Sequence, residues 1–309
     1  MSFQTLNTAT GVYVIAVTPF LPDGALDLAS TDRMVDFYAE AGATGLTVLG
    51  MMGEAQKLTQ SESVTVARRV IERAGALPVV VGVSAPGLAA VRELGLQSME
   101  MGAAGVMITP PSALRTDEQI IGYYRQAAEA LGPDVPVVLQ DFPLATGVQM
   151  STAALCRIVQ EVPSIAMLKH EDWPGLGKIS GLRRAEAEGQ RRISVLTGNG
   201  GMFLPEEMAR GADGAMTGFS YPEMMVGVER LMRRGDTAAA QDLFDAYLPF
   251  ARYEQQPGLG LAIRKEALAR RGVIAHPTLR KPGPALSAAD LQDIDRLIAR
   301  QDARLAELA

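Results

Sequence analysis

The chain has 309 residues, of which 48% are hydrophobic and 21% charged, so it can bury a large core. Its net charge of −6 offers no basic face for nucleic acid, and no apolar run is long enough to span a membrane. The single cysteine, Cys156, excludes an intrachain disulfide, and the N-terminus lacks the pattern of a secretory signal, so we expect a cytoplasmic protein without nucleic-acid or membrane partners.

A repeating unit runs along the chain: a short β-branched run, a turn and an amphipathic helical pattern. The runs are apolar rather than alternating, which is typical of parallel strands that are covered on both faces. The predicted strands are Val12–Val17, Thr47–Leu49, Val79–Val83, Val106–Thr109, Val135–Leu139, Ile165–Leu168, Ser194–Thr197 and Ala215–Thr217.

Helical patterns separate these runs. Thr59 with Glu62 has the spacing of a capping box, and Thr116 with Gln119 forms a second one. Gly42 follows a predicted helix end, where a left-handed cap favours glycine. The predicted helices are Leu28–Ala41, Val64–Ala74, Ala89–Met101, Ile120–Leu131, Thr152–Gln160, Leu176–Glu188, Phe203–Ala209 and Glu223–Arg233.

Strands that alternate with helices in this way predict one closed (β/α)8 TIM barrel over residues 1–234. The alternative is an open, doubly wound sheet, but Thr18-Pro19-Phe20 stands where its first strand would lead into GxGxxG. Residues 235–309 have no strand pattern and predict a C-terminal helical extension. Its expected helices are Thr237–Phe250, Gly260–Arg271 and Ala288–Leu305, with the proline-rich segment Pro277–Pro284 before the last one.

In such barrels the active site lies where the strands end. Lys169 follows the apolar run Ile165–Leu168, and an apolar surrounding can desolvate an amine and make it a better nucleophile. A solvated lysine at a strand end is the alternative interpretation. The loop Gly50–Glu54 has closely spaced glycines whose N–H groups can turn toward a carboxylate, although a plain strand-to-helix turn has the same pattern.

Metal chemistry has little support in the sequence. His170 and His276 are the only histidines, and there is no HExxH motif or Cys/His cluster. Asp141, Glu171 and Asp172 together could hold Mg²⁺, which leaves a metal-dependent aldolase as an alternative. We expect neither a metal nor a cofactor.

Several motifs occur in one order and spacing along nearly the whole chain: Gly11–Phe20, Gly50–Glu54, Gly102–Pro110, Pro143 with Thr146-Gly147, Lys169, Gly198-Asn199 and Gly211–Gly214. Together they resemble the dihydrodipicolinate synthase / N-acetylneuraminate lyase family. The resemblance implies a (β/α)8 barrel with a C-terminal helical extension, usually assembled as a homotetramer or else a homodimer. It also implies a Schiff base between Lys169 and the keto carbon of pyruvate or a similar 2-keto acid.

The sequence departs from dihydrodipicolinate synthases at several positions. Met51 and Met52 replace the two threonines of the glycine loop. Gln140 and Ser112 stand where the family has its two relay tyrosines. Ala145 aligns with the arginine that receives the carboxylate of the aldehyde substrate. These departures argue against a role in lysine biosynthesis.

Another branch of the family fits these positions better. Gln140-Asp141-x-Pro143, Glu171 and Gly214–Gly218 resemble the 2-keto-3-deoxy sugar acid dehydratases, in particular L-2-keto-3-deoxyarabonate dehydratase. The resemblance implies a lyase that dehydrates or cleaves a 2-keto-3-deoxy sugar acid through a Schiff base.

Lys169, Glu171 and Gln140 are the predicted catalytic residues. Without a tyrosine relay, Glu171 is the first candidate for proton transfer, and Gln140 would donate or accept a hydrogen bond. The glycine loop would receive the substrate carboxylate, and Asn199 and Thr217 would contact hydroxyl groups. The predicted substrate-binding residues are Gly50, Met51, Met52, Gly53, Asp141, Asn199 and Thr217, with a structural role as the alternative for Asp141.

Other functions stay open at this point. Dihydrodipicolinate synthase or another pyruvate-dependent aldolase shares the imine chemistry. The metal-dependent aldolase would lose its activity in EDTA. A 2-keto acid binding protein without catalysis is suggested by the missing tyrosines and threonines, and it would bind a keto acid without forming a trapped adduct.

Overall fold

The computed structural model describes residues 4–173 and 175–308. Its parallel strands close into a barrel in chain order, and β8 pairs with β1. The strands are β1 Gly11–Ile15, β2 Gly45–Val48, β3 Val79–Gly82, β4 Gly105–Ile108, β5 Val137–Asp141, β6 Ile165–His170, β7 Ser194–Thr197 and β8 Gly214–Thr217. Each predicted strand overlaps one of these, so the (β/α)8 barrel is confirmed.

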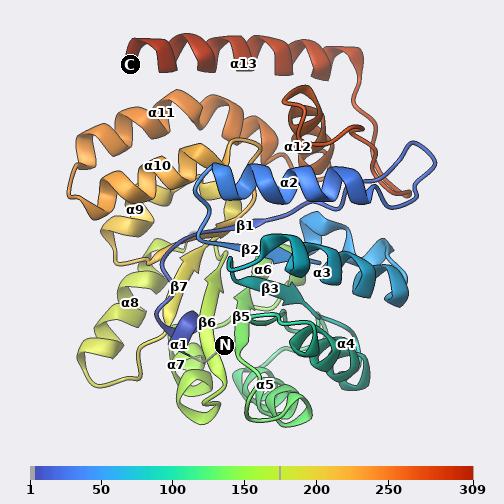
Figure 1. Ribbon diagram of the computed structural model, residues 1–309. Coiled ribbons are helices and arrows are strands. Elements are labelled where there is room, and N and C mark those ends of the chain that lie inside the picture. Colours follow the sequence, from blue (N-terminus) through green and yellow to red (C-terminus); the bar gives the residue numbers. More distant parts are fainter. Residues whose placement is uncertain (1–3, 174, 309) are drawn as a thin grey trace.

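Helices follow the strands and surround the barrel (Figure 1). Both predicted capping boxes are present, with Thr59 and Thr116 each accepting from the backbone N–H three residues on. The helices are α2 Leu28–Glu40, α3 Gln60–Ala74, α4 Leu88–Glu100, α5 Asp117–Leu131, α7 Thr152–Glu161, α8 Leu176–Ala187, α9 Leu204–Ala209 and α10 Pro222–Arg233.

One-turn elements were not predicted, because a single turn shows no hydrophobic period. They are α1 Gln4–Asn7, α6 Pro143–Thr146 and the 3₁₀ turns η1 Met51–Gly53, η2 Ala55–Lys57 and η3 Asn199–Gly201. Leu6 of α1 is fully buried among side chains of the barrel interior, including Ala104, Val138 and Ala166. α1 is therefore fastened to the barrel interior through Leu6.

Two strands reach further than predicted, which matters for the site. β5 begins at Val137 rather than Val135, because Pro136 has no N–H to donate to a neighbouring strand, and it continues through Asp141. β6 continues through His170. Lys169 therefore lies within a strand, paired in register with Gln140, rather than in the following loop.

The last part of the chain forms α11 Thr237–Glu254, α12 Gly260–Arg270 and α13 Ala288–Leu308. α11 packs on α10, and α13 packs on α11, so that the last helix lies on the outside of the molecule (Figure 1). Within residues 4–173 and 175–308, no helix combines the length and apolar character needed to cross a membrane.

Candidate active site

Lys169, Glu171 and Gln140 form one hydrogen-bonded group at the C-terminal ends of β5 and β6. Lys169 Nζ lies 2.9 Å from Glu171 Oε1. Gln140 Nε2 donates to Glu171 Oε2 over 2.7 Å. All three residues are buried, and the glutamate carboxylate is shared between an amine and an amide. The structure thus brings together the three predicted catalytic residues.

Strand geometry explains why these side chains meet. Successive side chains on a strand point to opposite faces. Val138 and Met167 belong to the cluster that fills the barrel interior, so Gln140 and Lys169, two positions further along, also face inward. They stand above an apolar layer at the mouth of the barrel.

The backbone around Glu171 is held on two sides. Its N–H donates to Asp141 O over 2.8 Å, and its carbonyl oxygen accepts from Asn199 Nδ2 over 3.2 Å. A glycine at position 198 leaves the space for its side chain, because a Cβ there would lie only 2.0 Å from Glu171 Cγ. The Gly198–Gly201 loop therefore makes room for a carboxylate of the protein itself.

Asn199 and Thr217 hold this same loop. Asn199 has a positive φ of 52° and directs its amide to the Glu171 carbonyl. Thr217 Oγ1 accepts from Gly200 N over 2.8 Å and is buried. Their predicted contact with substrate hydroxyls stays a prediction, while their protein contacts support a role in positioning Glu171.

Asp141 lies on the other face of β5 from Gln140, where its contacts support the structural alternative rather than a contact with the substrate. Its Oδ2 accepts from Lys178 Nζ over 2.7 Å, and His170 Nδ1 lies 3.6 Å from the same oxygen. Asp172 Oδ2 lies 2.8 Å from Lys178 Nζ as well. Asp141 is fully buried, so the structural alternative holds: it fastens α8 to the barrel.

This arrangement also separates the carboxylates of the metal-dependent alternative. Glu171 is directed to Lys169, whereas Asp141 and Asp172 share the ammonium of Lys178. Among the residues that the structure describes, no group of three or more His, Cys, Asp or Glu side chains is arranged to hold a metal ion. Asp141, Glu171 and Asp172 therefore do not converge on one site.

The glycine loop forms the 3₁₀ turn η1. Gly53 N donates to Gly50 O over 3.0 Å, and Thr18 Oγ1 donates to Gly53 O over 2.6 Å. Met51 and Met52 are the first two residues of this turn, so their N–H groups find no acceptor within it. These two amides are the ones that could face a substrate carboxylate.

Glu54, which ends this loop, anchors it to the C-terminal helices. Glu54 is fully buried with a positive φ of 54°, and its Oε1 lies 2.6 Å from Lys265 Nζ of α12. Lys57 Nζ and Arg280 N donate to Oε2. Burial lowers the pKa of Lys265 to about 8. This link could not be predicted from the sequence, because no local pattern relates residues so far apart.

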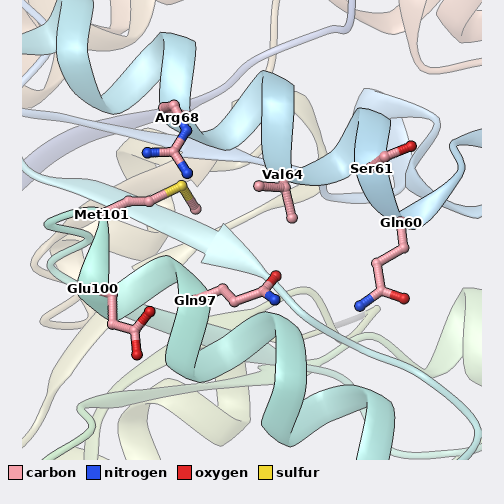
Figure 2. A pocket seen from close by; sticks show the side chains of 7 residues that line it. All are labelled: Gln60, Ser61, Val64, Arg68, Gln97, Glu100 and Met101. Atoms are coloured by element: carbon pink, nitrogen blue, oxygen red, sulfur yellow. The ribbon is translucent and has the colours of Figure 1, made fainter.

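A cavity of about 530 Å³ lies beside the catalytic group. Gly50, Met51 and Gln140 border it, and so do residues at the ends of β3 and β4. A second hollow, of about 750 Å³, lies between α3 and α4 on the outer surface (Figure 2). Arg68 and Met101 line that hollow, and none of the three predicted catalytic residues borders it. The first cavity, which Gln140 borders, is therefore the candidate substrate site.

Comparisons with known proteins agree with this geometry. Residues 8–301 match the Dihydrodipicolinate synthetase family. The chain belongs to this family. Its members are lyases that form a Schiff base, and the chain is such a lyase.

Individual members of the dihydrodipicolinate synthetase family differ in the activity they are named for. An L-2-keto-3-deoxyarabonate dehydratase from Azospirillum brasilense is 31% identical over 281 residues, which cover 89% of each chain. A 4-hydroxy-tetrahydrodipicolinate synthase from Sorangium cellulosum is 30% identical over 75% of this chain and 76% of its own. A crystal structure of a dihydrodipicolinate synthase from Rhodopseudomonas palustris has 52% identity and a TM-score of 0.94, covering 96% of this chain and 98% of that one.

Proposed function

We propose that this lyase dehydrates or cleaves a 2-keto-3-deoxy sugar acid through a Schiff base on Lys169, like an L-2-keto-3-deoxyarabonate dehydratase. The observation that carries the proposal is the Lys169–Glu171–Gln140 group, in which a carboxylate occupies the position next to the amine. Glu171 can accept the proton of the Lys169 ammonium, which frees the amine as a nucleophile.

The reaction then follows from imine chemistry. The amine attacks C2 of the keto acid, water leaves, and an iminium forms. The iminium withdraws electrons, so a proton can leave C3 to give an enamine. The electron pair of the enamine expels the hydroxyl on C4, which departs as water after protonation. In the aldolase variant, C3 keeps its proton and the iminium instead accepts the electron pair of the C3–C4 bond. The C4 hydroxyl loses its proton to a base, an aldehyde leaves, and an enamine remains on the lysine.

Glu171 is the proposed group for moving these protons. Its carboxylate lies within hydrogen-bond distance of Lys169 Nζ, the atom that becomes the imine nitrogen. Gln140 fixes the other carboxylate oxygen and carries no titratable proton. We propose that the Met51 and Met52 amides receive the substrate carboxylate.

A pyruvate-dependent synthase is the alternative within the family. Its proton relay, as implied by the family resemblance, would need tyrosines where this chain has Gln140 and Ser112. The relatives include both dehydratase and synthase names. The residues around Lys169 favour the dehydratase.

Borohydride trapping tests the proposal. Reduction in the presence of pyruvate or a 2-keto-3-deoxy pentonate should add the mass of the reduced adduct to the peptide that contains Lys169. Lys169→Ala should abolish this adduct, and a Lys281→Ala variant, which changes an exposed lysine, should keep it. An adduct that persists in Lys169→Ala would contradict the mechanism, and ligand binding without any adduct would favour a non-catalytic binding protein.

We also propose that the protein assembles as a homotetramer, or else a homodimer, as the family resemblance implies. Light scattering of the purified protein measures this directly. A monomeric mass at micromolar concentration would contradict it.

A further inference from the structure

We propose that the cavity beside Gln140 accepts a substrate tail that carries no charge. The tail is the part of the 2-keto acid beyond the carbon that joins Lys169. This inference rests on the proposed function, because it assumes a Schiff base on Lys169. It specifies a class of substrate with one carboxylate at the keto end and neutral groups beyond it.

The position of the cavity connects it to the reacting carbon. The cavity borders both the Gly50 loop and Gln140, and Gln140 is the neighbour of Lys169 in the β5–β6 register. In the proposed binding mode, the keto acid is joined to Lys169, its carboxylate lies at the loop, and its far end extends into this space. Its volume of about 530 Å³ is in the range of small-molecule sites and much larger than pyruvate needs.

The walls of the cavity are mostly apolar. Large aliphatic and thioether side chains reach it from the ends of β2, β3 and β4 and from neighbouring loops and α4. They are Leu49, Met51, Leu58, Val83, Leu94 and Met107.

The polar groups of the walls are amides and hydroxyls. Among the residues that the structure describes, none of those lining the cavity is charged. Ser84 Oγ accepts from Thr109 N over 2.9 Å, which fixes the hydroxyl and leaves its proton for a ligand. Gln60 and Gln56 supply further neutral donors and acceptors.

The positive charge next to the lining residues in the sequence, that of Lys57, is bound by other groups of the protein. Lys57 lies between the lining residues Gln56 and Leu58, but its ammonium is held by Glu54 Oε2 and by Arg280 O, each at 2.8 Å. A second carboxylate, a phosphate or an ammonium in the cavity would therefore lose water without gaining an opposite charge. That transfer is unfavourable, whereas a hydroxyl can be hydrogen-bonded by the amides and hydroxyls of the walls.

The experiment compares keto acids that differ in the charge of their tails. The probes are pyruvate, 2-ketohexanoate, a 2-keto-3-deoxy pentonate and 2-ketoglutarate, each at a concentration below saturation. The wild-type protein should trap the two acids with neutral tails at least about tenfold faster than 2-ketoglutarate, which corresponds to about 1.4 kcal/mol.

A charge introduced into the cavity should change this preference. Ala145 lines the cavity, so Ala145→Arg should bring 2-ketoglutarate to within about threefold of 2-ketohexanoate, by the scale of one charge-assisted hydrogen bond. Leu144→Arg is the matched control, because Leu144 is 64% exposed and does not border the cavity. Its preference should equal that of the wild type.

Each outcome decides between distinct claims. Equal trapping of neutral and charged tails by the wild type overturns the inference while leaving the Schiff base intact. An unchanged preference in a folded Ala145→Arg variant shows that the tail lies elsewhere and also overturns it. If pyruvate and every other probe fail to form an adduct, the proposed function itself fails.

Discussion

Glu171 occupies the space that a side chain at position 198 would need. A Cβ at that position would lie 2.0 Å from Glu171 Cγ and 2.4 Å from Oε1. Gly198 has an ordinary negative φ of −110°, so the requirement for glycine comes from this contact and not from its backbone conformation. The Glu171 carboxylate can lie beside Lys169 partly because Gly198, directly after β7, has no side chain.

The first prediction follows from this contact. Gly198→Ala should displace the Glu171 carboxylate and lower kcat about tenfold or more, because proton transfer depends on hydrogen-bond distance. Gly177→Ala is the matched control. A Cβ at Gly177 meets no atom within 4 Å, so this helical substitution should leave kcat unchanged and slightly raise stability. Equal kcat in both variants would contradict the positioning of Glu171 by Gly198.

The second prediction separates the two halves of the reaction. Glu171→Gln keeps the size of the side chain and a hydrogen-bonding oxygen but removes the titratable carboxylate. We expect kcat to fall about 10²-fold or more, the usual contribution of a general acid or base, with a smaller loss in the rate of borohydride trapping. Single-turnover measurements with a 2-keto-3-deoxy acid give both rates. Equal loss in the two rates would remove Glu171 from the later proton transfers.

How well a feature could be predicted from the sequence depends on how far apart in the chain its residues lie. The strands could be predicted, because apolar runs and helical periods are local signals. The local sequence left Lys169 open between a nucleophile and a solvated lysine, and its role in a Schiff base was predicted from the family resemblance. Glu171 was predicted from the family resemblance and from the missing tyrosine relay, whereas its contact with Lys169 is seen only in the structure. The role of Gly198 could not be predicted, because it depends on how closely β6 and β7 approach each other. For Asp141 the sequence left a substrate contact and a structural role open, because only the observed extent of β5 shows which face it occupies.

The third prediction concerns the link between the glycine loop and α12. Lys265→Met should leave the buried Glu54 carboxylate with less compensation and lower the free energy of unfolding by about 3–5 kcal/mol. In the variant that still folds, KM should rise more than kcat falls, because Glu54 follows the loop proposed to bind the substrate carboxylate. Denaturant unfolding and steady-state kinetics measure the two effects.

The double variant Glu54→Gln/Lys265→Met is the control for this prediction. It removes the uncompensated charge, so it should regain part of the stability that Lys265→Met loses. A double variant whose loss equals the sum of the two single losses would show that the pair is not coupled. An unchanged KM in the folded single variant would show that α12 does not position the loop.

The fourth prediction concerns the pH dependence of stability. Glu207 on α9 is 6% exposed, and burial raises the pKa of its carboxyl to about 7 from an ordinary value of 4.5. Between these two values the folded protein retains a proton that the unfolded chain has released. The free energy of unfolding should therefore fall as the pH rises from about 4.5 to about 7, by at most roughly 1.4 kcal/mol per pH unit from this group.

Glu207→Gln should remove this dependence, since the amide is neutral at every pH. We expect the variant to match the wild type near pH 5 and to exceed its stability at pH 8 by roughly 1–3 kcal/mol. Glu188→Gln, at an exposed position, serves as the control and should follow the wild-type curve. Urea unfolding at several pH values measures all three proteins. Parallel curves for the wild type and Glu207→Gln would mean that Glu207 is ionised in the folded protein at pH 5, and that the interior near β7 is more polar than its burial indicates.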